Sequence, residues 1–516
     1  VVLGGDRAAA LAGLDLVATG SGPGQAVQGT AAPVGPVVFV FPGQGSQWRG
    51  MGRQLYAESA VFAGAIDECA RAFAPWLDRS LVDVVTGADP GAEQERADIV
   101  QPALFAVMVS LARVWRSLGV VPDAVVGHSQ GEVAAAYVSG AISLGDAARI
   151  VAARSRAMAG LAGSGGMSSV GASLEWVRER LAPWAGRLSV AAENGPASVV
   201  ISGEIPALEE FAELATGAGV RVRRVKVDVA GHSHYLEPLR DRLLADIADV
   251  TSRESAVKFY STVTGGLFDT RGLDPGYWYT NLRSTVRFGA VAEQLMGVPG
   301  SVLVEVSPRP VLQVAMAETA DALAASPVVA GTLDREDGGL RKVLTALAEL
   351  YVRGVPADWN ATPAGVPARR IALPTYPFQR QRYWLTAAEE AAPATGPAPV
   401  LATEPAVLGL VCAEAAAMLA AKGSALTEGD VLARAAEKFK DLGFDSSLAV
   451  GLRNRLAAAA GVRLSATVAF THPTPEALAR HIFSLLEPVE PLEPEVPAGE
   501  PSVDDDLFAL IDRGYL

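Results

Sequence analysis

The sequence predicts an α/β protein that carries a small inserted subdomain and is followed by a compact helical unit. Between residues 36 and 330, apolar runs typical of buried strands alternate with amphipathic helices, which favours a mostly parallel sheet. The pattern changes over about 165–228, where short strands and two helices follow one another. An Ala/Pro-rich stretch at 387–404 has the composition of a linker and precedes helical periodicity over 405–487.

In the main unit, we expect a strand at 36–41, a loop at 42–46, a helix around 104–115, a strand at 124–126 and helices at 132–139 and from 146. The inserted segment is predicted as strand, helix (174–181), strand, strand (198–202), helix (205–215) and strand (220–227), which is a ferredoxin-like order. In the last unit, helices are expected near 407–418, from Ser446, and over 474–486.

Size, charge and cysteines limit the function classes. At 516 residues the chain is too long for one core. Its net charge is −14, and eight acidic residues against one basic lie in 488–516, so this is an acidic tail and nucleic acid is not the expected partner. Cys69 and Cys412 are too far apart in sequence for a disulfide framework or a metal site, which fits a reducing cytoplasm.

No membrane segment or signal sequence is expected. The longest apolar candidate, from Pro405, is interrupted by Glu414. The first residues carry no signal pattern, and the chain is expected to be a piece of a longer polypeptide.

Ser129 is the candidate nucleophile. It is the centre of a Gly-His-Ser-Gln-Gly motif at 127–131, between a predicted strand and a predicted helix. Two glycines allow the sharp turn that holds a serine outward, and the N–H of Gln130 then faces the same space at a helix start, where a developing oxyanion is stabilised. The alternative is a tight glycine-rich turn without chemistry.

A serine hydroxyl needs a base, and the chain has five histidines. His128 adjoins the nucleophile on the turn and is expected to point elsewhere, while His472 and His481 belong to the helical unit. His232 and His234 remain as candidates, with a surface loop as the alternative. No acid in the order of an α/β-hydrolase triad is apparent.

Two further residues attract attention. Gln44 follows a strand in a glycine-rich loop and is a candidate second oxyanion donor. Arg154 falls on the apolar stripe of its helix, between Ile150 and Met158, so we expect its guanidinium to be buried. A buried guanidinium requires an acidic partner, either a protein carboxylate or a carboxylate on the substrate.

These motifs resemble the acyltransferase domain of modular type I polyketide synthases. The resemblance rests on Phe-Pro-Gly-Gln-Gly-Ser-Gln at 41–47, on the motif around Ser129, on Arg154 and on the Ala-Gly-His loop ending at His232, and it covers 36–330. It implies an α/β-hydrolase-like core. Asp-Leu-Gly-Phe-Asp-Ser, ending at Ser446, is similar to the acyl carrier protein of the same systems, over 405–487.

The resemblance also implies the flanking segments. Residues 1–35 are similar to the end of a ketosynthase-to-acyltransferase linker, and 331–386 to a post-acyltransferase linker ending in Tyr-Trp-Leu. The tail at 488–516 is a candidate docking segment for a following synthase polypeptide, or else a disordered terminus.

The mechanism implied by the resemblance is a two-step transfer. Ser129, deprotonated by His232, attacks an acyl-CoA thioester while N–H groups of Gln44 and Gln130 hold the oxyanion. Arg154 grips the free carboxylate of a malonyl-type unit, and the acyl group then moves to a 4'-phosphopantetheine arm on Ser446. The family uses a Ser–His dyad, which agrees with the missing acid.

The resemblance favours an α-branched unit. Arg-Ala-Asp-Ile-Val-Gln at 96–101 and Gln130 are similar to the type that selects such units. Val229 and Gly231 stand where methylmalonyl-type domains usually have Tyr and Ser, which favours ethylmalonyl narrowly over methylmalonyl. Asn194 is expected near the substrate.

The residues around Ser446 are compatible with two roles for its side chain. A serine at a helix start is a common N-cap, and a helix N-terminus also suits a phosphodiester. The resemblance implies modification by a separate phosphopantetheinyl transferase and cooperation with the ketosynthase of the same module.

Two other functions stay open. A serine hydrolase or thioesterase predicts hydrolysis of neutral acyl esters without dependence on Arg154. A non-catalytic scaffold or docking fragment predicts that no acyl adduct forms at Ser129.

Overall fold

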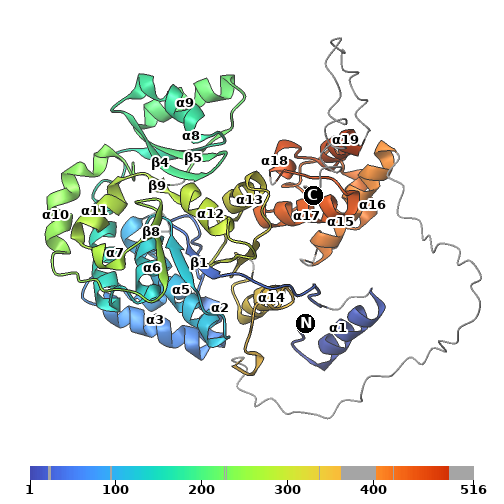
Figure 1. Cartoon of the computed structure of the whole chain (residues 1–516), viewed down its shortest axis with the longest axis horizontal. Helices are drawn as coiled ribbons and strands as arrows, with labels where there is room; N and C mark the ends of the chain where they lie inside the picture. The colour runs from blue at the N-terminus through green and yellow to red at the C-terminus, as the bar shows by residue number, and fades with distance from the viewer. Residues whose placement is uncertain are drawn as a thin grey trace, which may run out of the picture. The chain divides into compact units, whose positions relative to one another are not determined.

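The computed structural model describes residues 1–20, 25–92, 96–225, 227, 229–335, 337–361, 403–421, 424–465 and 467–486. It contains an N-terminal α/β unit within residues 1–361 and a C-terminal helical unit within residues 403–486, and each is described by itself (Figure 1). Three predicted segments lie outside the described residues: most of the 387–404 linker, the end of the 331–386 linker, and the acidic tail.

The N-terminal unit is built on a six-stranded sheet. The strand order is β11-β10-β1-β2-β7-β8, and every neighbouring pair is parallel except β7 with β8. The mostly parallel α/β core predicted from the sequence is confirmed. The strands are β1 (Val37–Phe41), β2 (Ala124–Gly127), β7 (Lys258–Ser261), β8 (Gly266–Phe268), β10 (Val302–Glu305) and β11 (Val328–Gly331).

Helices cover both faces of this sheet because alternate strand residues point to opposite sides. Phe39 and Phe41 belong to a large core, whereas Val38 and Val40 belong to a second core. The large core includes side chains of α3 (Ala60–Phe73), α5 (Ala97–Ser117), α6 (Gly131–Ser139), α7 (Leu144–Ala159) and α14 (Leu340–Tyr351), and the second those of α12 (Phe288–Met296) and α13 (Gln313–Ala322). The large core therefore continues past residue 330.

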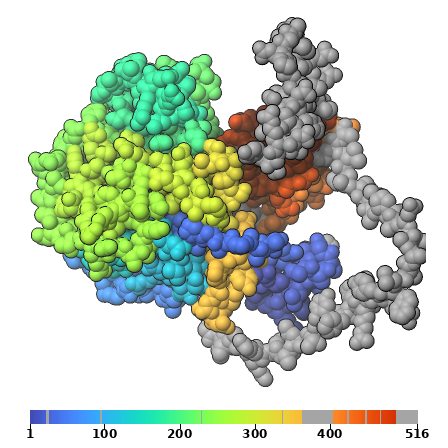
Figure 2. Space-filling model, in the orientation of Figure 1, coloured from blue at the N-terminus to red at the C-terminus, as the bar shows by residue number. Residues whose placement is uncertain are grey.

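A smaller five-stranded sheet follows α7. Its order is β6-β3-β5-β4-β9, and β6-β3-β5-β4 reproduces the predicted ferredoxin-like arrangement. With α8 (Leu174–Arg180) and α9 (Ile205–Gly217) it forms a separate lobe at the top of the N-terminal unit (Figures 1 and 2). Its strands are β3 (Gly166–Val170), β4 (Leu188–Gly195), β5 (Ser198–Gly203), β6 (Val222–Arg224) and β9 (Val286–Arg287), the last contributed from beyond the insertion.

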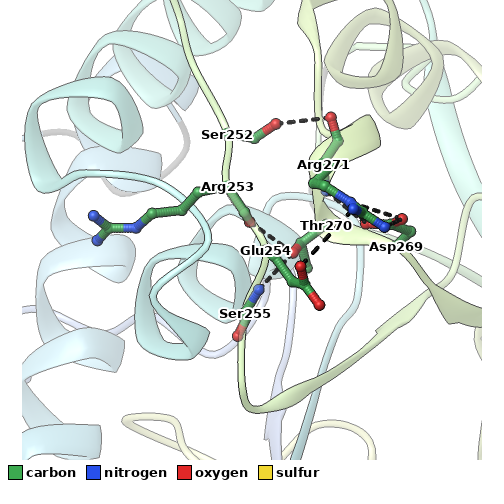
Figure 3. A network of polar contacts seen from close by, with 7 residues as sticks. All are labelled: Ser252, Arg253, Glu254, Ser255, Asp269, Thr270 and Arg271. Carbon is green, nitrogen blue, oxygen red and sulfur yellow. Dashed lines mark hydrogen bonds and ion pairs between the residues drawn. The ribbon is translucent and has the colours of Figure 1, made fainter.

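The loop containing Arg253 and Ser255 makes hydrogen bonds with the C-terminal end of α6. Arg253 Nε donates to Gly140 O, and Ser255 Oγ donates to Ser139 O, so both satisfy carbonyls left open where the helix ends. Thr270 fixes this loop in turn, because its hydroxyl accepts from Ser255 N and donates to Arg253 O (Figure 3). The contacts matter for function because the other end of α6 carries the Ser129 turn.

The N-terminal unit contains further helices, several of which place side chains in the large core. They are α1 (Arg7–Thr19), α2 (Arg53–Glu58), α4 (Leu81–Thr86), α10 (Arg240–Asp246) and α11 (Pro275–Arg283), with 3-10 turns η1 (Ala182–Trp184), η2 (His234–Leu239), η3 (Thr270–Gly272) and η4 (Trp359–Ala361).

The described residues of the C-terminal unit, 403–421, 424–465 and 467–486, form helices joined by turns, which confirms the predicted helical character. Its helices are α15 (Glu404–Ala421), α16 (Glu428–Ala433), α17 (Ser446–Ala460), α18 (Val468–Thr471) and α19 (Pro475–Leu486), and α15 packs against α16 and α19. By length and composition α5 and α15 could each cross a membrane, but the apolar window of α5 is 89% buried in the core, against 33% for α15. The burial of α5 identifies it as a core helix.

Candidate active site

Ser129 occupies a strained turn between β2 and α6. Its φ is 55°, in the left-handed region that costs energy for a residue with a side chain. The flanking glycines are required sterically: a Cβ on Gly127 would lie 2.1 Å from Glu132 N, and one on Gly131 would lie 2.0 Å from Phe41 O. The sequence motif thus forms the sharp turn expected of an exposed nucleophile.

His232 faces this serine. Its Nε2 lies 2.8 Å from Ser129 Oγ, and its Nδ1 lies 2.8 Å from the carbonyl oxygen of Ser284. Because a carbonyl can only accept, Nδ1 carries the proton and the bare Nε2 accepts from the serine hydroxyl. Burial, and then the positive charge of Arg154, lower the pKa of His232 to about 3, so the ring is neutral and able to take a proton.

The other histidines lie elsewhere. His234 stacks on Tyr235, with ring centroids 4.3 Å apart. His472 and His481 stack on one another in the C-terminal unit. Of the candidates for a base, only His232 makes a hydrogen bond with Ser129 in the described part of the chain.

Arg154 is buried beside the nucleophile. Its side chain extends from α7, the residue is 3% exposed, and Nη2 lies 3.4 Å from Ser129 Oγ. Of the two partners that the sequence left open, a protein carboxylate is not in contact: among the described residues, Nη1 donates to the amide oxygen of Asn281 at 2.8 Å and Nε has no partner. Burial lowers the pKa of Arg154 to about 10, so the guanidinium stays charged at neutral pH and is available to an external anion.

The proposed oxyanion donors flank the same serine. Gln130 is the residue before α6 and lies at the helix N-terminus, where unpaired N–H groups favour negative charge. Gln44 is half-buried in the loop after β1, and that loop touches the nucleophile turn, since a Cβ on Gly43 would lie 3.5 Å from Ser129 Cβ. The geometry suits a developing oxyanion on the side of Ser129 that faces both loops.

His128 and Asn194 join the turn to the small subdomain. His128 Nε2 donates to Asn194 Oδ1 at 2.8 Å, so His128 points away from Ser129 as predicted. Burial lowers the pKa of His128 and keeps its ring neutral. Asn194 contacts the residue next to the nucleophile rather than the nucleophile itself.

In the loop before His232, Val229 is tightly packed whereas Gly231 adjoins free space. Val229 is 4% exposed and packs into the large core. At Gly231 an added Cβ would meet Met167 Sδ at 3.8 Å and Met158 Cε at 3.9 Å, which are ordinary contact distances. Gly231 therefore leaves room for a small side chain next to two flexible methionines.

Ser446 is the first residue of α17. The side chain of Asp445 accepts from Leu448 N at 2.8 Å, so Asp445 supplies the cap that we considered for Ser446. A serine at the first position of a helix fits a phosphodiester attachment.

Several residues of the site were not found from the sequence. From distant parts of the chain, Asn281 and Tyr277 reach Glu132, three residues after Ser129, and Asn281 also reaches the carbonyl of Ser129. The Ser284 carbonyl contacts His232. Glu132 did leave a signal, because it is the one charged residue of α6, a helix that is otherwise apolar and buried.

Comparison with known proteins gives matches to both units. Residues 38–357 match the family model of the acyl transferase domain, and residues 427–482 match that of the phosphopantetheine attachment site. The chain is 48% identical over 538 residues to the spectinabilin polyketide synthase system protein NorC of Streptomyces orinoci, covering 97% of this chain and 23% of the relative. It is 49% identical over 433 residues to polyketide synthase GfsB of Streptomyces halstedii, covering 84% of this chain and 8% of the relative.

Comparison with solved structures also finds acyltransferase domains of polyketide synthases. The acyltransferase domain from module 8 of the salinomycin polyketide synthase is 47% identical, with a TM-score of 0.67, and the match covers 70% of this chain and 85% of that one. This chain spans less than a quarter of the length of the two relatives named above.

Proposed function

Because this chain belongs to the acyltransferase family of modular polyketide synthases and continues into a phosphopantetheine-attachment domain, we propose that it loads a malonyl-type unit from CoA onto its own carrier domain. The observation that carries the proposal is the convergence on Ser129 Oγ of a neutral base, His232 Nε2 at 2.8 Å, and a buried cation, Arg154 Nη2 at 3.4 Å. A neutral acyl ester gives the buried cation no partner, whereas a carboxylated acyl unit does.

In the first half-reaction, His232 takes the proton of Ser129 as its oxygen attacks the thioester carbonyl carbon. The Ser284 carbonyl holds the proton on Nδ1 and stabilises the imidazolium that forms. N–H groups of Gln130 and Gln44 stabilise the oxyanion, and Arg154 holds the distal carboxylate in a bidentate pair. The C–S bond then breaks, the proton on Nε2 goes to the leaving CoA thiolate, and an acyl ester remains on Ser129.

In the second half-reaction the acyl group leaves Ser129 for the carrier domain. Ser446 would hold the 4'-phosphopantetheine, which would supply the accepting thiol. His232 Nε2 would hold one proton during this half-reaction and return it to Ser129 Oγ, so that the serine hydroxyl is restored when the acyl ester bond breaks. Attachment of the arm requires a phosphopantetheinyl transferase, and the product would serve the ketosynthase of the same module; a cytoplasmic location is part of the proposal.

We further propose an α-branched unit, with ethylmalonyl favoured over methylmalonyl. The space at Gly231 supports this, because a serine there would approach Met158 and Met167 and fill volume that an ethyl branch could occupy. Val229 contributes less, since its side chain packs into the core.

The test is intact-mass measurement of the acyl adduct after incubation with competing malonyl-, methylmalonyl- and ethylmalonyl-CoA. A dicarboxylic adduct is expected in the wild type and in Ser446→Ala, and no adduct in Ser129→Ala. The arm should attach to Ser447→Ala but not to Ser446→Ala. An adduct that persists in Ser129→Ala would refute the assignment of the nucleophile.

A second variant tests the branch preference. Gly231→Ser should lower the ratio of ethylmalonyl to methylmalonyl loading by about tenfold or more, because one methylene in a tight pocket is worth ~1–3 kcal/mol. Gly217→Ser is the matched control, since a Cβ at Gly217 meets nothing within 4 Å. An unchanged ratio in Gly231→Ser would rule out this loop as the determinant.

A further inference from the structure

Glu132, the buried acid in the first turn of α6, is the charged group that acts on Arg154. Glu132 is completely buried, yet among the described residues it makes no ion pair. Its carboxylate accepts instead from neutral donors, and the countercharge it provides reaches Arg154 only through space. The donors are Thr262 N, Tyr277 OH at 2.7 Å and Asn281 Nδ2 at 2.8 Å, and the Thr262 hydroxyl is shared between Glu132 Oε1 at 2.8 Å and Gly127 O at 3.0 Å.

Asn281 lies between the two charges. Its Oδ1 accepts from Arg154 Nη1 at 2.8 Å, while its Nδ2 donates both to Glu132 Oε2 and, at 3.1 Å, to the backbone carbonyl of Ser129. The amide can adopt only this orientation, because the flipped form would direct its oxygen at two acceptors and its NH₂ at a cation. One side chain therefore fixes the guanidinium relative to the nucleophile turn.

The neutrality of Asn281 has a consequence. A carboxylate at the same position would pair with the guanidinium directly and compete with any carboxylate that a substrate brings. An amide offers the guanidinium an acceptor without cancelling its charge. Glu132 supplies the compensating negative charge from the far side of Asn281. Two groups on Arg154 are left over, since Nε has no partner in the described structure and Nη2 makes only the 3.4 Å contact with Ser129.

We propose that Asn281, held by Glu132, is a positioning residue that keeps Arg154 fixed but unneutralised, and that it thereby sets the preference for carboxylated over neutral acyl units. The inference rests on the proposed role of Arg154 as the carboxylate clamp. It adds that the affinity of Arg154 for a substrate carboxylate depends on the neutral amide of Asn281, and that Glu132 sets the orientation of this amide.

The test uses pairs of acyl-CoA substrates that differ only in the carboxylate: ethylmalonyl-CoA with butyryl-CoA, and methylmalonyl-CoA with propionyl-CoA. The measurement is kcat/KM for acylation of Ser129 within each pair, together with the separate KM and kcat values. In Asn281→Asp, which is nearly isosteric, the ratio of carboxylated to neutral substrate should fall by at least about tenfold, mainly through a higher KM for the carboxylated member. Butyryl-CoA and propionyl-CoA should lose less than their carboxylated counterparts, so the ratio within each pair, and not the absolute rate, is the readout.

Asn360→Asp is the matched control, because it makes the same change of charge at an exposed residue of η4. Asn281→Ala provides a second variant if Asn281→Asp does not fold. Without the amide, Arg154 loses its acceptor and can turn toward Glu132, so the ratio should again fall. Equal losses for both members of each pair, in either folded variant, would overturn the proposal, since a merely structural role does not distinguish the substrates.

Failure of the inference can be separated from failure of the proposed function. If the wild type shows no preference for the carboxylated substrate, and Arg154→Gln leaves the ratio unchanged, the clamp itself is wrong. If the wild type has the preference and Arg154→Gln loses it while Asn281→Asp and Asn281→Ala keep it, only the role of Asn281 is refuted.

Discussion

The fall of the acylation rate at low pH, here called the acid limb, directly tests the lowered pKa of His232. A histidine with the ordinary pKa of 6.5 is mostly protonated at pH 5.5, so a reaction that needs it neutral would slow by about tenfold between pH 8 and pH 5.5. Burial and the charge of Arg154 lower the pKa of His232 to about 3. With that value the ring stays neutral across the whole interval, and kcat/KM should change by less than about 1.5-fold.

The assay is rapid-quench measurement of the Ser129 adduct by intact mass, with limiting acyl-CoA so that kcat/KM reports the free enzyme. Each sample is returned to pH 7.5 and assayed again, which separates titration from irreversible loss. Arg154→Gln, measured with butyryl-CoA, should show an acid limb at higher pH than the wild type, because the second largest of the three causes that lower the pKa of His232 is gone. An acid limb near pH 6.5 in the wild type would refute the reasoning.

A bound carboxylate should move the same limb. It offsets the charge of Arg154, so the pKa of His232 is higher in the complex with ethylmalonyl-CoA than in the free enzyme. The acid limb of kcat should therefore lie at higher pH than that of kcat/KM for carboxylated substrates, and the two should coincide for butyryl-CoA.

Three further predictions concern the framework around the site. Gly131→Ala should abolish adduct formation and lower Tm, because its Cβ would lie 2.0 Å from the carbonyl oxygen of Phe41 in β1. The control is Gly64→Ala, whose Cβ would meet nothing within 4 Å; because alanine favours a helix over glycine, it should stabilise the protein by ~0.5–1 kcal/mol. Equal effects in the two variants would contradict the steric argument. Thr270→Val removes the hydroxyl that fixes the loop of Figure 3 and should cost ~1–3 kcal/mol in urea unfolding, and no change in the midpoint would show that the loop is held otherwise. Cys69 and Cys412 are buried, with pKa values raised by burial to about 12 and about 11, so iodoacetamide at pH 7.5 should label neither in the native apo protein and both in denaturant.

The local parts of the site could be predicted from the sequence. The turn at Ser129 is encoded within five residues, because its two glycines meet atoms that no side chain could avoid. Arg154 could be found because helical periodicity alone places it on a buried stripe. Of the two partners that we considered for it, a protein carboxylate in contact is not found among the described residues, since the contact is the amide of Asn281, which in turn donates to Glu132.

The long-range parts could not be predicted. A backbone carbonyl such as that of Ser284 carries no side-chain signal, and Asn281 lies in a helix of aromatic and polar residues without a motif of its own. The ferredoxin-like order of the small sheet was predictable from its alternation of strands and helices. The fifth strand, β9, was not, because two residues are too few to leave a periodic pattern.

That two-residue strand joins the base to the small subdomain. β9 begins two residues after Ser284, whose carbonyl orients His232, and it pairs in parallel with β4, with Ala192 opposite Val286. Thr285, between them, donates from its hydroxyl to Val190 O at 2.7 Å. β4 also carries Asn194, which holds the histidine beside the nucleophile, so one strand of the inserted subdomain supports the residues adjoining both the base and the serine. Removing the hydroxyl in Thr285→Val should therefore slow acylation of carboxylated and neutral substrates alike, in contrast to Asn281→Asp, because it loosens the base that both substrates need and leaves the clamp untouched.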